Sequence, residues 1–222
     1  MSVMKFFRQF KDLGITGPFT RWYDKNTREY RLAEMRDYAN EVARHLTNGA
    51  NVLEVAPGPG YLSIELAKMG AYNITGMDIS ADFVEICKIN AKRENVNVTF
   101  VQGNVSAMPF EDNTFDFIVC SAAFKNFKEP VIALREMYRV LKNNGITLII
   151  DMNHNASKEK IEAEAVKTSR SGFERWFQKK TFGQLCKTAY TKDEFENMIK
   201  QTSFNKNDIK EIGIGLLVYI YK

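Results

Sequence analysis

A glycine-rich turn and a carboxylate further along the chain together have the chemistry to bind a nucleoside. The apolar run at residues 52–55 contains Glu54 and leads into residues 56–60, which read APGPG. Two glycines allow a tight turn and close approach of a ligand to the backbone, and a helix that begins after such a turn presents free N–H groups. Asp78 follows Gly58 by 20 positions. At the end of a second strand, its carboxylate is placed to accept hydrogen bonds from both hydroxyls of a ribose.

The details of this turn distinguish two kinds of nucleoside ligand. A pyrophosphate-binding turn has three glycines in the pattern G-x-G-x-x-G, but the residue three positions after Gly60 is Ser63. Glu54, near the turn, would repel a pyrophosphate and tolerate a cationic ligand. Because S-adenosylmethionine carries an ammonium and a sulfonium group, the charge balance favours it over a nicotinamide dinucleotide.

With these features the chain resembles the class I S-adenosylmethionine-dependent methyltransferases, in particular the methyltransferase type 11 group. Residues 52–60 are similar to the first motif of the family, an acidic residue followed by G-x-G-x-G. Glu54 takes the acidic position, and Ala56 stands in place of the first glycine. Residues 76–80 (GMDIS) are similar to the second motif, in which Asp78 is the ribose ligand.

Later segments continue the resemblance. Residues 102–110 (QGNVSAMPF) are similar to the family's G-D-A-x-x-L-P-F segment, with Asn104 where Asp is usual. The carbonyl oxygen of an Asn amide can still accept a hydrogen bond from the adenine amino group. Residues 115–121 are similar to the fourth motif and residues 134–145 to the helix and turn after it, so the match extends from about residue 50 to residue 151.

The resemblance implies S-adenosyl-L-methionine as the cofactor. Aromatic residues near the N-terminus, Trp22, Tyr23 and Tyr30, are available to close over the sulfonium, because aromatic faces attract cations; ordinary packing is the alternative. We therefore expect a cofactor site made of Tyr23, Glu54, Ala56, Gly58, Gly60, Asp78, Ile79, Asn104, Val105 and Ser121.

Strands that alternate with helices are predicted to position these residues. The strands fall at 52–55, 74–79, 98–102, 115–120 and 146–150, and the helices at 61–69, 81–94 and 131–141. Ser80 is the expected N-cap of the second helix, and residues 143–145 (NNG) form a turn. This alternation indicates an α/β fold with a Rossmann-like, doubly wound, mostly parallel sheet.

The flanking segments add helices and a hairpin to the predicted sheet. Residues 27–46 favour one long helix, residues 156–187 are helical, basic and aromatic, and Thr191 with Glu194 has capping-box spacing. Strands at 207–212 and 216–221 favour a C-terminal antiparallel hairpin. We expect one methyltransferase domain over residues 1–222, composed of an N-terminal helical cap (1–48), a cofactor-binding core (49–153), a helical lid (154–190) and a C-terminal helix with strands (191–222).

The N-terminal residues 3–13 place Met4, Phe6, Phe7, Phe10 and Leu13 near one helical stripe, with basic residues between them. A short helix that folds over the main domain is the simpler interpretation, and a helix on a membrane surface is the alternative.

Composition limits the partners. A net charge of +4 from 31 basic and 27 acidic residues is too mild for a nucleic-acid footprint, and no apolar run approaches the roughly 20 residues that cross a bilayer. The three cysteines (87, 120 and 186) and two histidines (45 and 154) show no metal-ligand spacing. We expect a cytoplasmic monomer or homodimer with reduced thiols and no metal, nucleic-acid or membrane partner.

The methyl acceptor is predicted to be a small molecule, with the O, N, S or C acceptor atom left open. In-line displacement from a sulfonium depends mainly on proximity and orientation, which contribute about 7–11 kcal/mol. Related enzymes often carry histidines around Lys125 and Asn126, but this chain has none there, so His154 is the remaining candidate base, with a solvated loop histidine as the alternative. Residues 170–190 are a candidate lid over the acceptor, with Arg170, Arg175, Lys179 and Lys180 facing an anionic acceptor or forming a solvated face.

Two other functions stay open. One is methylation of RNA or protein, and the other is a non-catalytic cofactor-binding homologue, suggested by Ala56, Asn104 and the missing loop histidines.

Overall fold

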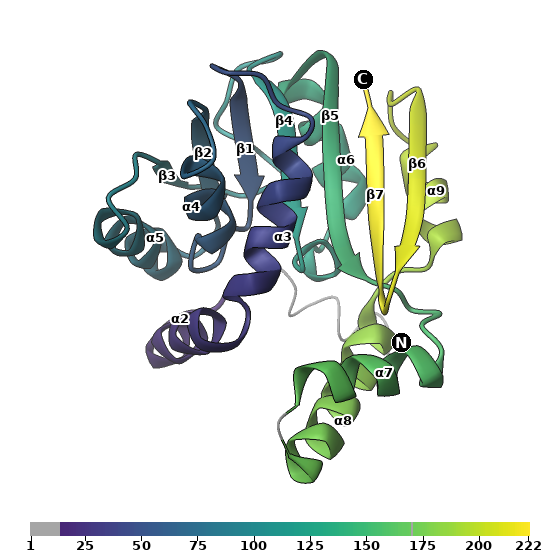
Figure 1. Cartoon of the computed structure of the whole chain (residues 1–222). Coiled ribbons are helices and arrows are strands. Elements are labelled where there is room, and N and C mark those ends of the chain that lie inside the picture. The colour runs from purple at the N-terminus through teal and green to yellow at the C-terminus, as the bar shows by residue number, and fades with distance from the viewer. Residues whose placement is uncertain (1–13, 170) are drawn as a thin grey trace.

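The computed structural model describes residues 14–169 and 171–222 and contains one seven-stranded sheet (Figure 1). The strand order is β3-β2-β1-β4-β5-β7-β6. All strands run parallel except β7, which pairs antiparallel with both of its neighbours. The strands are β1 (Asn51–Val55), β2 (Asn73–Asp78), β3 (Thr99–Gln102), β4 (Phe115–Ser121), β5 (Leu141–Met152), β6 (Lys206–Ile212) and β7 (Gly215–Tyr221). The predicted α/β class and C-terminal hairpin are confirmed.

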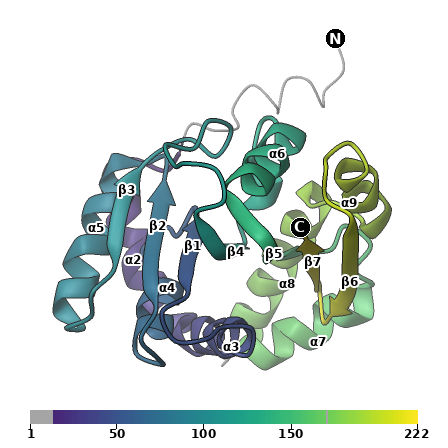
Figure 2. The ribbon, with the colours of Figure 1, turned by 90° about the horizontal axis from the view of Figure 1, so that it is seen from above.

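Helices cover both faces of the sheet (Figure 2). Neighbouring strand residues point to opposite faces, so Val52 packs with one set of helices and Leu53 with the other. The first layer contains α3 (Leu32–Ala43), α4 (Tyr61–Ala67) and α5 (Ala81–Arg93). The second contains α6 (Pro130–Val140) and α9 (Lys192–Ile199). Apolar side chains on both faces explain why the central strands are almost continuously hydrophobic.

Three predicted capping and turn features are present. The Ser80 side chain accepts a hydrogen bond from the Phe83 N–H at the start of α5. Thr191 and Glu194 form the reciprocal capping box of α9. Ile212 pairs with Gly215, which leaves two residues for the turn of the β6–β7 hairpin.

The single helix predicted over residues 27–46 is wrong. The structure has α2 (Pro18–Tyr30) and α3, with a break at Arg31, where φ is −120° and ψ is 2°. The break lets the two helices pack on different neighbours. Asp24 of α2 accepts hydrogen bonds from Tyr61 of α4 and Asn90 of α5, whereas the apolar side of α3 joins the core cluster on its face of the sheet.

Two further predictions need correction. The helical stretch predicted over 156–187 is two helices, α7 (Lys158–Thr168) and α8 (Gly172–Thr188), capped by Ser157 and Ser171. The turn predicted at 143–145 lies within β5. There the register shifts between Phe115, which pairs with Leu141, and Phe117, which pairs with Ile146, so the strand resumes after an irregularity. The helix expected at residues 3–13 lies outside the described residues.

Candidate active site

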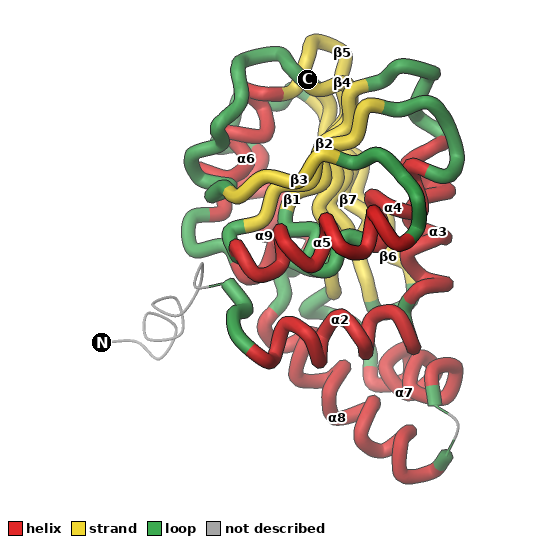
Figure 3. Tube along the Cα trace, turned by 90° about the vertical axis from the view of Figure 1, so that its left-hand side faces the viewer, coloured by secondary structure: helices red, strands yellow, loops and turns green. Residues whose placement is uncertain are grey.

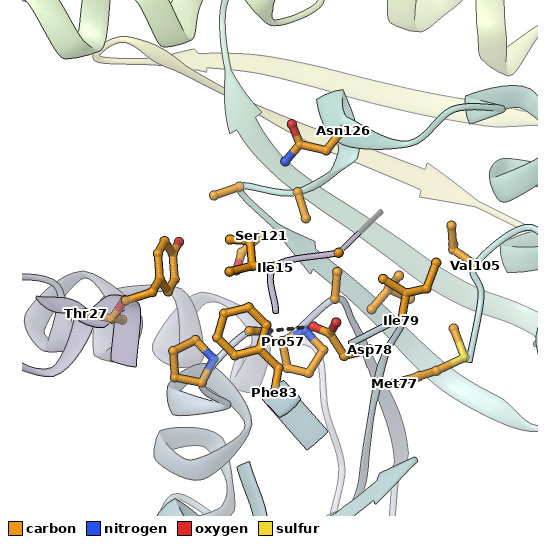
Figure 4. Close-up of a pocket in the computed structure, with 18 of the residues that line it drawn as sticks. Ile15, Thr27, Pro57, Met77, Asp78, Ile79, Phe83, Val105, Ser121 and Asn126 are labelled. Carbon is orange, nitrogen blue, oxygen red and sulfur yellow. Dashed lines mark hydrogen bonds between the residues drawn. The ribbon is translucent and has the colours of Figure 1, made fainter. Parts of the chain in front are cut away.

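A cavity lies at the carboxyl ends of β1, β2 and β4 (Figure 4). β1 is the switch point of the sheet, because the chain order runs outward from it on both sides. Ligands of doubly wound sheets bind at this point. Eight of the ten residues predicted to bind the cofactor line the cavity: Tyr23, Ala56, Gly58, Asp78, Ile79, Asn104, Val105 and Ser121.

The turn after β1 depends on left-handed backbone conformations. Ala56, Gly58 and Gly60 all have positive φ, at 55°, 55° and 82°. The Ala56 N–H donates to the carbonyl of Met77 over 2.8 Å, which fixes the turn against β2. A Cβ at Gly60 would lie 2.9 Å from the Cys87 sulfur. Gly60 therefore allows α4 to start close to α5 and is not among the described residues that line the cavity.

Glu54 also lies outside the cavity wall. It is buried in β1, and its carboxylate accepts hydrogen bonds from the backbone N–H of Ser63 at 2.9 Å and from the Ser63 hydroxyl at 2.5 Å. Burial raises the pKa of Glu54 to about 7, although the bonds from Ser63 oppose the shift. In this position the carboxyl anchors the first turn of α4. The sequence led us to expect contact between Glu54 and a cationic ligand, but the structure directs this carboxylate to Ser63 and away from the cavity.

Asp78 brings a carboxylate into the cavity wall. One of its oxygens accepts from the backbone N–H of Gly58 at 3.1 Å (Figure 4), and the other accepts from the backbone N–H of Ser80 at 2.9 Å. Burial raises the pKa of Asp78, against the effect of these N–H donors. An ionised carboxylate has about four lone-pair sites, so both oxygens keep capacity for further donors. The apolar side chains of Ile79 and Phe83 line the cavity beside it.

The loop after β3 contributes Asn104 and Val105. The side-chain oxygen of Asn104 accepts from the Ser106 N–H at 2.8 Å, and its backbone carbonyl accepts from Ala107 at 3.0 Å. These bonds shape the tight turn that presents Val105 to the cavity.

Helices α2 and α3 close another side of the cavity. Tyr23 meets Phe83 edge to face, with ring centroids 5.8 Å apart, and its hydroxyl accepts from the Arg31 guanidinium at 3.3 Å. Thr27 and Met35 line the cavity with them. The other two aromatic residues considered for the sulfonium, Trp22 and Tyr30, are exposed and do not belong to the described cavity lining.

The loop after β4 is held by a buried ion pair. The Lys125 ammonium donates to Asp151 at 2.8 Å and to the carbonyl of Ala122 at 2.9 Å. Asp151 also accepts from the Lys125 N–H at 2.9 Å. Ala122 has a φ of 56°, a conformation that non-glycine residues seldom adopt. The pair therefore braces the loop whose Asn126 and Phe127 line the cavity.

Several sequence-based candidates lie elsewhere. His154 donates its backbone N–H to Tyr190 and is absent from the described lining of the cavity. The described residues of α7 and α8 are also absent from the lining of the cavity, so the predicted lid does not cover the cavity in this structure. Among the described residues, no cluster of three or more His, Cys, Asp or Glu side chains could hold a metal ion. Within residues 14–169 and 171–222, none of the helices has the length and apolar character to cross a bilayer.

Comparison with known proteins decides the family. A model described as "Methyltransferase domain" matches residues 46–209, most of the chain. The chain belongs to the class I S-adenosylmethionine-dependent methyltransferases. The methyltransferase uses S-adenosyl-L-methionine as its cofactor, as the glycine-rich turn and Asp78 indicated.

Relatives and solved structures agree with this assignment. The methyltransferase is 28% identical to demethylmenaquinone methyltransferase of Staphylococcus haemolyticus, over 78% of this chain and 75% of that protein. It is 37% identical to a ubiquinone/menaquinone biosynthesis C-methyltransferase of Bdellovibrio bacteriovorus, over 46% of this chain and 44% of that protein. A structure assigned as an S-adenosyl-L-methionine-dependent methyltransferase from Methanococcus maripaludis has a TM-score of 0.73 and 25% identity, with 94% of this chain and 97% of that chain covered.

Sequence reasoning found Tyr23 but missed the other residues of the methyltransferase that the helical cap brings to the cavity, and it missed the ion pair that holds the loop after β4. Thr27, Arg31 and Met35 belong to no recognisable motif. They reach the cavity because the helix breaks at Arg31, whereas the sequence predicted one continuous helix. Lys125 and Asp151 are 26 positions apart, and no local pattern marks them as a pair.

Proposed function

We propose that the cavity holds the cofactor across the ends of β1 and β2 and a small methyl acceptor between α2, α3 and the loop after β4. The observation that carries this proposal is the Asp78 carboxylate in the cavity wall, next to a turn whose residues Ala56 and Gly58 have left-handed backbone. The carboxylate can accept hydrogen bonds from ribose hydroxyls, and the turn lets a ligand approach the backbone closely.

The residues present fit S-adenosylmethionine. Asp78 offers carboxylate lone pairs to ribose hydroxyls, and Ile79, Phe83 and Val105 offer an apolar surface to the adenine ring. The aromatic ring of Tyr23, which meets Phe83 edge to face, suits a cationic group. When bound, the cofactor supplies an electrophilic methyl group on its sulfonium.

The protein's part in the reaction is positioning. Because the thioether leaving group is neutral, its departure needs no general acid, and orientation of the two reactants can contribute about 7–11 kcal/mol. The braced loop after β4 and the α2–α3 bend provide rigid walls for this purpose. We place no general base among the described residues, since His154 does not reach the cavity.

The acceptor end of the cavity favours an apolar ring with few polar groups. Met35, Ala123 and Phe127 provide apolar contacts, and Thr27 and Asn126 provide hydrogen-bonding groups. Relatives named for demethylmenaquinone or for ubiquinone and menaquinone biosynthesis lead us to propose a quinone-type acceptor in its reduced quinol form. A ring carbon of the quinol forms the new bond to the methyl group as the bond from sulfur to that methyl breaks, and the ring proton at that carbon is released to solvent. The predicted domain division, cytoplasmic location and monomeric or dimeric state stay predictions.

Two measurements test this proposal. Calorimetric titration of the full chain with S-adenosylmethionine should show saturable binding, and absence of binding would overturn the cofactor placement. Incubation with labelled cofactor and a demethylated quinol should give a product heavier by one methylene group. Label transfer to RNA or protein in place of the quinol would support the alternative acceptor class.

A further inference from the structure

An exposed aromatic face lies at the N-terminal end of α8. Phe173, Trp176 and Phe177 are 76%, 57% and 57% exposed. Their spacing of three and four residues puts them on one side of the helix, and the rings of Phe173 and Trp176 stack with centroids 6.2 Å apart. Large apolar groups rarely gather on the surface of a globular protein without a partner. We call these three residues the α8 aromatic face.

A second aromatic pair occupies the same end of the molecule. Phe19 and Trp22 of α2 stack with centroids 4.9 Å apart and are 52% and 56% exposed. Two perpendicular views show α2 and α8 below the sheet, at the end where the parallel strands terminate (Figures 1 and 3). The cavity opens at the carboxyl ends of these strands. Both aromatic groups therefore lie on the side of the molecule that contains the site.

Basic residues adjoin both groups. Lys180 and Lys187 follow Phe173 by seven and fourteen positions and continue the same side of α8 toward its C-terminus. Overall, α8 contains four basic residues and one acidic residue. Arg175 and Lys179 pair with Glu162 of α7, which leaves Lys180 and Lys187 as the lysines on the aromatic side. On α2, Arg21 and Lys25 are exposed close to Trp22 in the chain, and Glu29 is also exposed, seven positions after Trp22.

We propose that this end of the enzyme docks on the surface of a lipid bilayer with anionic headgroups. Aromatic side chains are favoured at the boundary between headgroups and acyl chains, and lysines nearby are attracted to anionic lipids. The α8 aromatic face enters this boundary, with Lys180 and Lys187 at headgroup level and Phe19 with Trp22 as a second contact. The composition alone led us to expect no membrane partner, and the paired exposed faces emerge only in the folded chain.

The docking gives the proposed quinone-type acceptor a route to the cavity, and in this respect it rests on the proposed function. A lipid-soluble acceptor is concentrated in the bilayer, so an enzyme held with its cavity end at the surface meets it there. The adsorption itself depends only on the aromatic and basic residues and can be measured without any acceptor.

The chain's two tryptophans, Trp22 and Trp176, report separately on the two aromatic groups. The test uses the full chain with vesicles of phosphatidylcholine alone or mixed with phosphatidylglycerol. We expect co-sedimentation with the mixed vesicles, and in Trp22→Phe a blue shift of Trp176 emission with quenching by brominated acyl chains. Phe173→Ser combined with Phe177→Ser should lower the partition coefficient about tenfold, because apolar area drives insertion.

A matched control is Ile89→Ser, which removes a 63% exposed apolar side chain from α5 on the flank of the sheet and should leave partitioning unchanged. Lys180→Glu with Lys187→Glu should abolish the preference for anionic vesicles. Equal partitioning of the native chain and the Phe173/Phe177 double variant would overturn the proposal.

Other occupants of the face give different results. If a second copy covers it, the double variant will have a lower molar mass in solution by light scattering. If another part of the chain covers it, the double variant will melt at a lower temperature without vesicles. Either outcome, with no vesicle binding, overturns the docking. Failure of docking would leave S-adenosylmethionine binding and methylation of a soluble short-chain quinol intact, whereas failure of the proposed function would remove both.

Discussion

The proposed cofactor end and the proposed acceptor end of the cavity are held by different kinds of hydrogen bond. At the proposed cofactor end, Asp78 and Asn104 in the cavity wall and Glu54 behind it accept hydrogen bonds from backbone N–H groups of nearby loops and helix starts. At the acceptor end, side chains bind one another, as Lys125 and Asp151 do. Backbone donors belong to any sequence that makes the turn, whereas side-chain pairs need two particular residues. The proposed cofactor end thus depends on local turns, and the proposed acceptor end on a pair of particular side chains.

The largest test of this comparison is removal of the buried cation at the acceptor end. Lys125→Met leaves Asp151 buried without its ionic partner, and loss of one member of such a pair costs about 3–5 kcal/mol of unfolding free energy. Urea denaturation measures the change.

The matched control is Lys142→Met. It breaks the half-exposed pair with Asp116, at 2.9 Å, and should cost under about 1 kcal/mol. Similar losses in the two variants would mean that the loop after β4 does not depend on its buried pair.

At the cofactor end, Glu54→Gln should stabilise the protein increasingly as pH rises. The pKa of Glu54 is raised by burial from 4.5 to about 7. Below pH 4.5 the carboxyl is protonated in both the folded and unfolded states, so the variants differ little in pH dependence. Between pH 4.5 and about 7 the carboxyl ionises in the unfolded chain but stays protonated in the folded chain. The native chain therefore loses up to about 2–3 kcal/mol of unfolding free energy that the Gln variant keeps, and the loss is complete once the pH exceeds the folded pKa. Thermal melts at about pH 5 and about pH 8 measure the change, because these values lie near the unfolded pKa of Glu54 and above its folded pKa.

Glu65 on the neighbouring helix provides a control of opposite sign. Burial disfavours its ionisation, but hydrogen bonds from Lys68 and Arg36 outweigh burial and keep its pKa low. Glu65→Gln should lose stability relative to the native chain at neutral pH. If both variants changed the stability at neutral pH in the same direction, the contrast between Glu54, which has no ionic partner among the described residues, and Glu65, which is paired with two basic residues, would be contradicted.

Asp78→Ala should weaken S-adenosylmethionine binding at least about tenfold, because a hydrogen bond to a charged group contributes roughly 1.5–3 kcal/mol. Calorimetry measures the dissociation constant. In the native chain, the affinity for S-adenosylmethionine should decrease as the pH is lowered through the raised pKa of Asp78, because the ionised carboxylate is the form that accepts hydrogen bonds from the ribose hydroxyls. An unchanged affinity in the variant would refute the ribose assignment.

The counterpart at the acceptor end is Asn126→Ala. Loss of one neutral hydrogen bond of about 1 kcal/mol should raise the KM for the acceptor about fivefold. The dissociation constant for S-adenosylmethionine should stay as in the native chain. If both constants moved together in this variant, the division of the cavity into two ends would be wrong.

The smallest expected effect concerns the two alanines with left-handed backbone, one at each end. Ala56→Gly and Ala122→Gly relieve a conformation that costs an Ala about 1–2 kcal/mol, while glycine loses about 0.5–1 kcal/mol in chain entropy. The net gain in unfolding free energy should be about 0.5 kcal/mol at each site. Chemical denaturation checks it, with Ala56→Val as the strained control that should lose stability.

Much of the parallel sheet, and eight of the residues that line the cavity at its edge, could be predicted from the sequence. Periods of apolar residues, the caps at Ser80 and Thr191 and the turn at 56–60 depend on interactions between residues close in the chain. Eight of ten predicted cofactor residues line the cavity because they follow directly after strands, and strand ends of a parallel sheet meet at one edge.

The sequence by itself thus determined the α/β class, the alternation that makes the sheet, and the turn and carboxylate of the cofactor end. Only the tertiary structure decided that Arg31 breaks the N-terminal helix, that Glu54 faces Ser63 instead of the cavity, and that Lys125 meets Asp151. Local hydrogen bonds and periodicity act within a few residues and leave a visible pattern. The direction of a buried side chain depends on neighbours brought together from distant positions, and no short pattern records it.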